Sequence, residues 1–346
     1  MLKELEKFID DYYEKNKNSG VIRVTVKDEI VFEKNFGYAD VEHKVPFSKD
    51  SKFTFYSLSK PFCTIGLLKL KDKGLIDLDV HPAVYVPEAK GFDKRVTIRH
   101  LLLHISGIPD FDISTDFRTK GISGTPDMLR KQLCELAEYP MYFEPDSNFK
   151  YTNINFILCA LIIENVSGMK YKDYMQKEVF APLGMKNTCI DEKGLVLKNR
   201  VTGYELLENG EIKPIDRATD WAFGAADCIG TLDDVYCLNK AIKHKLLLKE
   251  ETWKEVLTPS RHSSFGMGCL VTKWHGMKLI RHNGGWYGFR TLHYQLPEDD
   301  FDIIILSNSG WGDLRNNFSE KIYEIFYGDN SNAGEIIQMD AGYATR

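Results

Sequence analysis

Three short groups of residues in this chain have the types and spacings needed for acyl transfer through a serine ester. A serine precedes a lysine by three positions, a tyrosine precedes an asparagine by two, and a histidine precedes a glycine by two. They supply a nucleophile with its own amine, a phenol with an amide, and a strand edge against which an acyl group could lie. In chain order the groups are Ser57 and Lys60, Tyr151 and Asn153, and His282 and Gly284.

Sequence context selects Ser57 among three S-x-x-K matches. Ser147 lies in a run of turn residues, and Ser167 directly precedes a glycine. Ser57 instead follows a strand-like stretch, 52–56, and precedes an apolar helical stretch, so we expect it to open a helix that enters the core. Lys60 then projects from the same helix face. The unpaired N–H groups and the positive dipole end of such a helix favour negative charge on the serine oxygen.

The second and third groups complement this nucleophile. Residues two apart in extended backbone point the same way, so Tyr151 and Asn153 can face one cleft. The phenol can relay a proton beside the lysine, and the amide can hold the lysine or a substrate amide. After His282, glycines let a substrate approach the strand edge. The N–H of Gly285 can then act as an oxyanion donor, together with the N–H of Ser57.

Each group also has an ordinary structural interpretation. S-x-x-K alone fits a helix-start serine beside a solvated lysine. Asn153 could cap the next helix, Tyr151 could pack at the surface, and the stretch after His282 could be a glycine-rich turn. His100 and His104 stand four residues apart. The H-E-x-x-H pattern is absent and no third ligand is apparent, so we expect structural roles for both and no metal.

Composition is typical of a soluble globular protein, and the motifs above imply a small-molecule or peptide substrate. The chain has 346 residues, 43% hydrophobic and 27% charged, and a net charge of −5, which disfavours a nucleic-acid partner. The longest apolar stretches, 156–163 and 303–306, are too short to cross a bilayer. Residues 1–13 form an amphipathic helical pattern without the apolar core of a secretory signal. We expect a cytoplasmic protein, or one whose leader has been removed; the oligomeric state stays open.

The seven cysteines are scattered, odd in number and mostly within apolar segments. They are typical of reduced core residues rather than of a disulfide framework, and there is no C-x-x-C pair to indicate zinc.

Strand patterns lie near both ends of the chain, and helical patterns lie between them. A β-hairpin is predicted at 21–26 and 30–36, and further strands at 267–273, 277–281, 290–295 and 302–307. Helices are predicted at 98–103, 126–136, 154–166, 171–179, 232–242 and 314–326. We expect an α/β (α+β) fold, with one antiparallel sheet flanked by helices and an inserted all-helical subdomain.

Residues 1–330 are predicted to form a single domain, followed by a polar tail, 331–346. Within the domain, a sheet-containing lobe takes about 1–75 and 258–330, and a helical lobe takes about 76–257. The nucleophile would sit where these layers meet.

The three groups and their surroundings resemble the serine β-lactamase and penicillin-binding-protein superfamily, in its class C β-lactamase, D,D-carboxypeptidase and esterase branch. Residues 57–60 resemble S-x-S-K, and 151–156 resemble Y-S-N-x-N-Y. Residues 97–107 resemble T-I-x-x-L-L-x-H-x-S-G, and 182–185 match P-L-G-M. The resemblance extends from about 37 to 308 and implies a β-lactamase/transpeptidase-like fold without a cofactor.

By position, the resemblance implies Ser57 as nucleophile, Lys60 as its activating base or proton shuttle, and Tyr151 as partner base. It also implies Asn153 as a positioning group, and the N–H groups of Ser57 and Gly285 as an oxyanion hole.

One departure bears on the substrate. β-Lactamases of this branch carry a lysine in K-T-G where this chain has His282, and the H-x-G form resembles D,D-peptidases, D-aminopeptidases and some esterases. Loss of the fixed charge argues against efficient β-lactam hydrolysis, unless Arg281 or Arg290 replaces it. With a histidine there, we expect an ionisation of the rate near the ordinary histidine pKa of about 6.5.

The sequence therefore predicts a serine hydrolase that cleaves an ester, an amide or a D-amino-acid peptide through a Ser57 acyl-enzyme. Two alternatives remain open: a penicillin-binding or ligand-sensing protein that acylates with little turnover, and a true class C-like β-lactamase.

Overall fold

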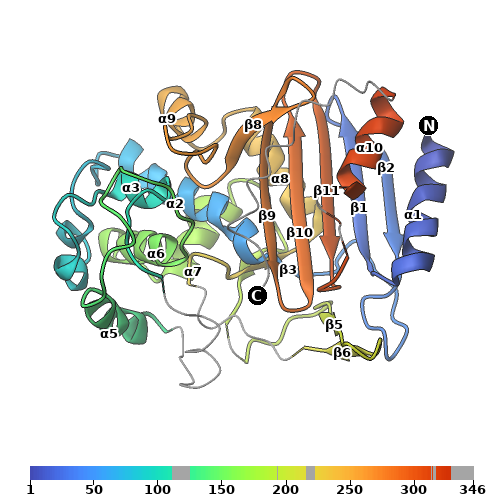
Figure 1. The fold of residues 1–346 in the computed structure, drawn as a ribbon, viewed down its shortest axis with the longest axis horizontal. Helices are drawn as coiled ribbons and strands as arrows, with labels where there is room; N and C mark the ends of the chain where they lie inside the picture. The colour runs from blue at the N-terminus through green and yellow to red at the C-terminus, as the bar shows by residue number, and fades with distance from the viewer. Residues whose placement is uncertain (111–124, 193, 216–222, 313, 315–316, 329–346) are drawn as a thin grey trace.

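The centre of the fold is an antiparallel sheet built from strands near both ends of the chain (Figure 1). The computed structural model describes residues 1–110, 125–192, 194–215, 223–312, 314 and 317–328, so the predicted polar tail lies outside the described residues. Across the sheet the strand order is β2 (Glu29–Phe36), β1 (Gly20–Val26), β11 (Phe301–Ser307), β10 (Phe289–Leu296), β9 (Met277–Trp286) and β8 (Leu270–Trp274). The prediction that strands from both termini join one antiparallel sheet is confirmed.

Tight turns fix the register of the hairpins β1–β2 and β9–β10. Lys27 and Asp28 join β1 to β2, and both have positive φ, 52° and 63°, as the turns that match strand twist require. Tyr287 and Gly288 join β9 to β10, and Gly288 has φ 72°. This second hairpin brings the stretch that begins at His282 to the middle of the molecule.

Helices cover both faces of the sheet. On one face, Leu5 of α1 and Phe318 of α10 share a buried cluster with Ile303 of β11. On the other face, α8 packs against β11, β1 and β10. The helices are α1 (Leu2–Asn16), α2 (Lys60–Asp72), α3 (Ile98–Leu102), α5 (Pro126–Leu136), α6 (Ile154–Ser167), α7 (Tyr171–Met175), α8 (Leu232–Lys243), α9 (Glu250–Val256) and α10 (Asn317–Tyr327).

Short elements complete the fold. The predicted helix 171–179 is α7 followed by a π-helical turn, Gln176–Phe180. Short 3₁₀ turns are Tyr56–Ser59, Pro82–Val84 and Pro87–Gly91. Two small sheets contain β3 (Phe53–Thr54), β7 (Cys228–Gly230) and β4 (Cys189–Ile190), and β5 (Tyr204–Leu206) and β6 (Ile212–Pro214).

The helical part is organised around α6. This helix is buried from Ile154 to Ile163 and contacts α2, α3 and α7. Among the described residues no single helix has the length and apolarity needed to cross a membrane. α6 and the segment Tyr171–Phe180, bent by 82° at the break between them, meet that requirement only when taken together, and only in length and composition. The seven cysteines are unpaired; four of them are buried, and Cys134 is exposed.

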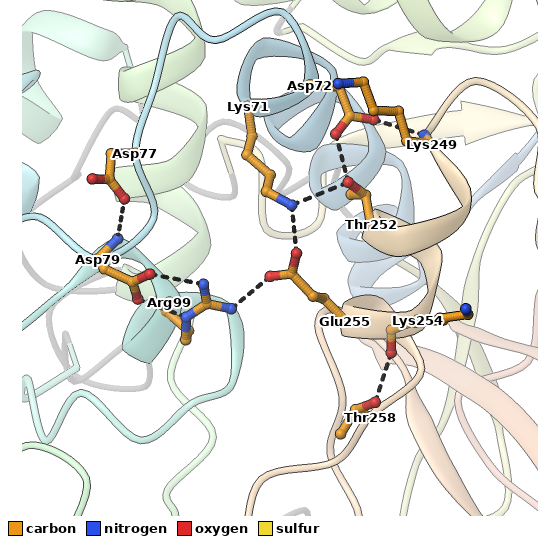
Figure 2. A network of polar contacts seen from close by, with 10 residues as sticks. All are labelled: Lys71, Asp72, Asp77, Asp79, Arg99, Lys249, Thr252, Lys254, Glu255 and Thr258. Carbon is orange, nitrogen blue, oxygen red and sulfur yellow. Dashed lines mark hydrogen bonds and ion pairs between the residues drawn. The ribbon is translucent and has the colours of Figure 1, made fainter.

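Ion pairs fasten α9 to two other helices (Figure 2). Arg99 of α3 donates to Asp79 and to Glu255 of α9, and Lys71 of α2 donates to Glu255 and to Thr252. The predicted division into lobes stays a prediction; α8, inside the range given to the helical lobe, packs on the sheet.

Candidate active site

Ser57 lies in the 3₁₀ turn Tyr56–Ser59, and α2 begins three residues later, at Lys60. The 3₁₀ turn continues without a break into α2, so the prediction that Ser57 opens a helix is confirmed, with a first turn that is 3₁₀ rather than α. Tyr56, directly before Ser57, has a φ of 49°, which lies in the left-handed region. That conformation costs a non-glycine residue about 1–3 kcal/mol. Pro61 lies in the first turn of α2, where its missing N–H has no helical partner.

Neighbouring strands hold this strained turn from both sides. The hydroxyl of Thr291 in β10 donates to the carbonyl of Phe55 over 2.8 Å. The N–H of Phe55 donates to the carbonyl of Cys228 in β7 over 2.9 Å. The hydroxyl of Tyr56 donates to the carbonyl of Tyr287 over 3.0 Å. These bonds offset the backbone strain and fix the nucleophile against the sheet.

Lys60 is wholly buried beside Ser57. Its Nζ lies 3.2 Å from Ser57 Oγ, 2.9 Å from Asn153 Oδ1 and 2.9 Å from the carbonyl oxygen of Ala225. Burial lowers the pKa of Lys60 from 10.5 to about 7, because desolvation disfavours the ammonium. A large fraction of the molecules thus carries a free amine near neutral pH, within reach of the serine hydroxyl.

Asn153 contacts this lysine instead of capping α6 with its side chain. It occupies the N-cap position of α6, but its side chain makes no capping bond, and its Oδ1 accepts from Lys60. The helix is capped from outside by Asp110, whose carboxylate accepts from the N–H groups of Asn153 (2.7 Å) and Ile154 (3.0 Å). The plain capping interpretation of Asn153 is therefore wrong.

Tyr151 lines the same site. The Lys60 amine lies over its ring, 4.6 Å from the centroid, and the hydroxyl oxygen is buried. The ring centroid lies 4.2 Å from that of His104, 5.6 Å from Phe265 and 6.5 Å from His282. Tyr151 is thus placed between the lysine and the third group rather than at the surface.

His100 and His104 have structural contacts, as predicted. Nδ1 of His100 accepts from the N–H of Thr97 (3.3 Å) and closes the cap of α3. His104 is buried, and its Nδ1 accepts from the N–H of Thr152 (3.3 Å). His104 thereby fixes the backbone next to Tyr151.

The third group lies directly against the nucleophile turn. β8 pairs with β9 only as far as Arg281, so residues 282–286 have β10 as their one strand neighbour among the described residues. A Cβ on Gly284 would lie 1.9 Å from the carbonyl oxygen of Phe55, so only glycine fits there. A Cβ on Gly285 would meet the Arg290 side chain at 3.1 Å. The oxyanion roles of the Ser57 and Gly285 N–H groups stay predictions.

His282 is buried and neutral, which corrects the expected ionisation. Its Nδ1 lies 2.7 Å from the carbonyl oxygen of Asn283, and its ring lies 5.7 Å from that of Phe265. Desolvation by this burial lowers the pKa of His282 well below its ordinary 6.5, and the Lys60 charge lowers it further. The prediction that His282 titrates near 6.5 is therefore wrong. Lys60 has its pKa near neutrality instead.

Neither arginine named from the sequence replaces the missing lysine. Arg281 donates to the hydroxyl of its cross-strand neighbour Tyr294 over 2.6 Å, and Tyr294 belongs to the cluster under α1 and α10. Because side chains alternate along a strand, Arg281 faces away from the side on which His282 lies. The Arg290 guanidinium donates to the carbonyl oxygens of Trp286, Phe289 and Gly310.

Several contributors to the site escaped sequence reasoning. Asp110 caps a helix that begins 44 positions after it, so local sequence carries no signal of the contact. Ala225 acts through its backbone carbonyl, which any residue provides. Phe265 packs on Tyr151 and His282 from a loop with no motif.

A family model, related sequences and solved structures all match most of this chain. The family model named Beta-lactamase matches residues 5–316. The chain is 27% identical to Penicillin-binding protein 4* of Bacillus subtilis (strain 168), over 88% of this chain and 71% of that protein. It is 26% identical to Protein flp of Staphylococcus aureus (strain N315), over 88% of this chain and 62% of that protein, so it spans less than two thirds of that relative. The solved D-amino acid amidase from Ochrobactrum anthropi SV3 superimposes with a TM-score of 0.76 at 24% identity, over 89% of this chain and 92% of that one.

Proposed function

The chain belongs to the Beta-lactamase family of serine hydrolases, and on this premise we propose that it cleaves a small ester, amide or D-amino-acid peptide through an acyl-enzyme on Ser57. One observation carries the proposal: the Nζ of wholly buried Lys60 lies 3.2 Å from Ser57 Oγ. A buried amine at that distance can accept the serine proton without first shedding a water shell.

The reaction divides into two acyl transfers. In the first, Ser57 Oγ attacks the substrate carbonyl carbon while its proton passes to Lys60 Nζ. The bond to the leaving alcohol or amine then breaks, and the leaving group takes that proton from Lys60, directly or through the Tyr151 phenol. In the second, a water adds to the ester carbonyl and gives a proton to the free Lys60 amine; Lys60 then returns that proton to Ser57 Oγ as the bond to Ser57 breaks and the acid departs. Asn153 holds Lys60 in place throughout, and the N–H groups of Ser57 and Gly285 would bind the oxyanion.

The charge balance of the third group favours esters and amides over β-lactams. A β-lactam carries a carboxylate that a lysine in K-T-G would hold, whereas His282 is neutral, and Arg281 and Arg290 are engaged elsewhere. The similar O. anthropi structure is named a D-amino acid amidase, so D-amino acid amides are the first compounds to test.

A second candidate is a protein that acylates with penicillins and hardly turns over. It is favoured by the third group, which lacks the fixed positive charge that a lysine in K-T-G would supply. A burst of product without a steady state would support it, whereas sustained turnover would exclude it.

The test compares Ser57→Ala with the matched control Ser147→Ala. Ser147 opens another S-x-x-K match but is exposed, and its hydroxyl donates to the carbonyl of Glu144. Each variant is assayed with p-nitrophenyl esters, D-amino acid p-nitroanilides and nitrocefin, and labelled with a fluorophosphonate and a fluorescent penicillin. We expect Ser57→Ala to lose both turnover and labelling and Ser147→Ala to keep them. Wild-type turnover and labelling in Ser57→Ala would refute the proposal.

A further inference from the structure

A buried carboxylate closes the turn that contacts the base of the proposed reaction. Lys60 Nζ donates to the carbonyl of Ala225, in the middle of residues 224–227. Asp227 ends this turn and is 2% exposed. Its Oδ2 accepts from the N–H of Gly224 over 2.7 Å, so the side chain folds the turn back on itself. The position of the Ala225 carbonyl therefore depends on Asp227.

The turn 224–227 is closely packed inside the protein. Gly224 has φ 71°, and a Cβ there would lie 2.4 Å from Ala160 Cβ of α6. The carbonyl of Asp227 accepts from the N–H of Asp191 over 2.7 Å. On the other side, the N–H of Cys228 donates to Ser59 Oγ over 2.9 Å. The Asp227 backbone is thus joined to the turn that carries the nucleophile.

We propose that Asp227 is a positioning residue for Lys60. Its carboxylate holds the Ala225 carbonyl against the Lys60 amine, and its negative charge favours the protonated form of that amine. The inference rests on the proposed acyl transfer at Ser57, to which Asp227 contributes without touching the substrate.

Electrostatics supports this coupling. Burial raises the pKa of Asp227 from 3.8 to about 7, and the charge of Lys60 opposes that rise. Burial lowers the pKa of Lys60 to about 7, and the charges of Asp110 and Asp227 oppose that fall. Each group of the Lys60–Asp227 pair therefore stabilises the charged form of the other, in surroundings that disfavour both charges.

Two other described carboxylates near this pair, those of Asp110 and Asp191, have partners that fix them. Both oxygens of Asp110 accept from N–H groups at the start of α6, and Asp191 is paired with Arg200 over 2.5 Å. Within the part of the chain that the structure describes, the remaining titratable groups that face the pair are Cys63 of α2, His104 after α3, Tyr151 before α6, Tyr171 of α7, Cys228 of β7 and His282 of β9.

The test removes the charge of Asp227 and keeps its hydrogen bond. In Asp227→Asn, the amide oxygen can still accept from the N–H of Gly224. The rate of fluorophosphonate labelling at Ser57 should rise with pH as Lys60 loses its proton; this rising part of the profile is called the acid limb. Without the carboxylate the Lys60 ammonium is less stable and its pKa is lower, so the acid limb should move to lower pH by about half a unit. Asp302→Asn is the matched control. Its carboxylate is 4% exposed and bonded to Thr25, and the limb should not move.

An acid limb that stays in place in Asp227→Asn, with labelling retained, overturns the inference. Asp227→Ala serves as a second comparison, because it loses both the charge and the bond to Gly224. A purely structural role would lower the melting temperatures of these variants and leave the limb at its wild-type pH.

Should Asp227→Asn fail to fold, Lys60→Met tests the same coupling from the other side. Because the pKa of Asp227 is raised in the folded protein, the free energy of unfolding should fall as pH rises from 3.8 to about 7. Without the Lys60 charge that pKa rises further, so urea stability of Lys60→Met should keep falling above about pH 7. A flat curve there overturns the inference. This measurement needs no activity, so it stands even where Ser57→Ala refutes the proposed function.

Discussion

The rate of Ser57 acylation should rise with pH through about 7 and level off above it, because the buried Lys60 amine accepts the serine proton. Desolvation lowers the pKa of Lys60 from 10.5 to about 7. At pH 7 about half of the molecules then carry the free amine, against about one in 3,000 for a lysine at its ordinary pKa. Below the limb the rate should fall about tenfold for each pH unit.

A substitution at His282 shows whether Lys60 or His282 is the group that titrates in this part of the profile. Burial keeps the pKa of His282 well below 6.5, so the ring is neutral across the limb. His282→Gln, which cannot titrate, should therefore keep the limb near 7. Lys60→Met should abolish acylation at every pH.

Labelling by a fluorophosphonate is the suitable assay, because the probe does not titrate in this range and needs no knowledge of the natural substrate. Second-order rate constants are measured from about pH 5 to 9 at constant ionic strength. The lowered pKa of Lys60 also makes stability fall as pH drops from 10.5 through about 7, so circular dichroism must show a folded protein at each point. A profile that is flat, or a limb that disappears in His282→Gln, would refute the reasoning.

Three further predictions concern stability, measured as free energies of unfolding in urea. Gly284→Ala should lose about 1–3 kcal/mol, because the added methyl would lie 1.9 Å from the carbonyl oxygen of Phe55. Asp191→Ala should lose about 3–5 kcal/mol, since it leaves the guanidinium of Arg200, 8% exposed, without its carboxylate. Glu255→Gln should lose less than about 1 kcal/mol, because its ion pairs are partly solvated (Figure 2); a larger loss would mean that the network is cooperative.

The side chains of the first two groups were predictable because the chemistry demands particular residue types. A serine needs a base within hydrogen-bond reach, and the S-x-x-K spacing places one within the next turn of the chain. Context then distinguished Ser57 from Ser147, which is exposed in a loop. The structure joins Ser57, Lys60 and Asn153 by hydrogen bonds, over a sequence separation of 93 residues.

The ionisation assigned to His282 was wrong because burial is a tertiary property. Its ring is covered by Phe265 and Tyr151, which come from distant parts of the chain. The left-handed conformation of Tyr56 was equally inaccessible, since no local propensity favours a tyrosine there. It is imposed by bonds such as that from the Tyr56 hydroxyl to the carbonyl of Tyr287.

The fold was predictable where elements are long enough to show a period. The hairpin β1–β2 and helices α5, α6 and α8 appear at or within two residues of the predicted bounds. β3 lies within the stretch 52–56 predicted as strand-like. Other strands of two or three residues, such as β4 and β7, show no alternation, and α9 has only seven residues. β7 nevertheless matters to the site, because Cys228 holds Phe55 beside the nucleophile.

A charge at position 282 should change the pKa of Lys60 and with it the pH at which Ser57 labelling begins to rise. His282 and Lys60 interact electrostatically, and the lysine charge lowers the pKa of the histidine. A cation placed at 282 would act on Lys60 in the same sense, because like charges disfavour each other's protonated form. His282→Lys should therefore shift the acid limb of Ser57 labelling below its wild-type position, while the neutral His282→Gln leaves it in place. A shift of the limb to higher pH in His282→Lys would contradict this coupling, because it would mean that the new amine had not brought positive charge near Lys60.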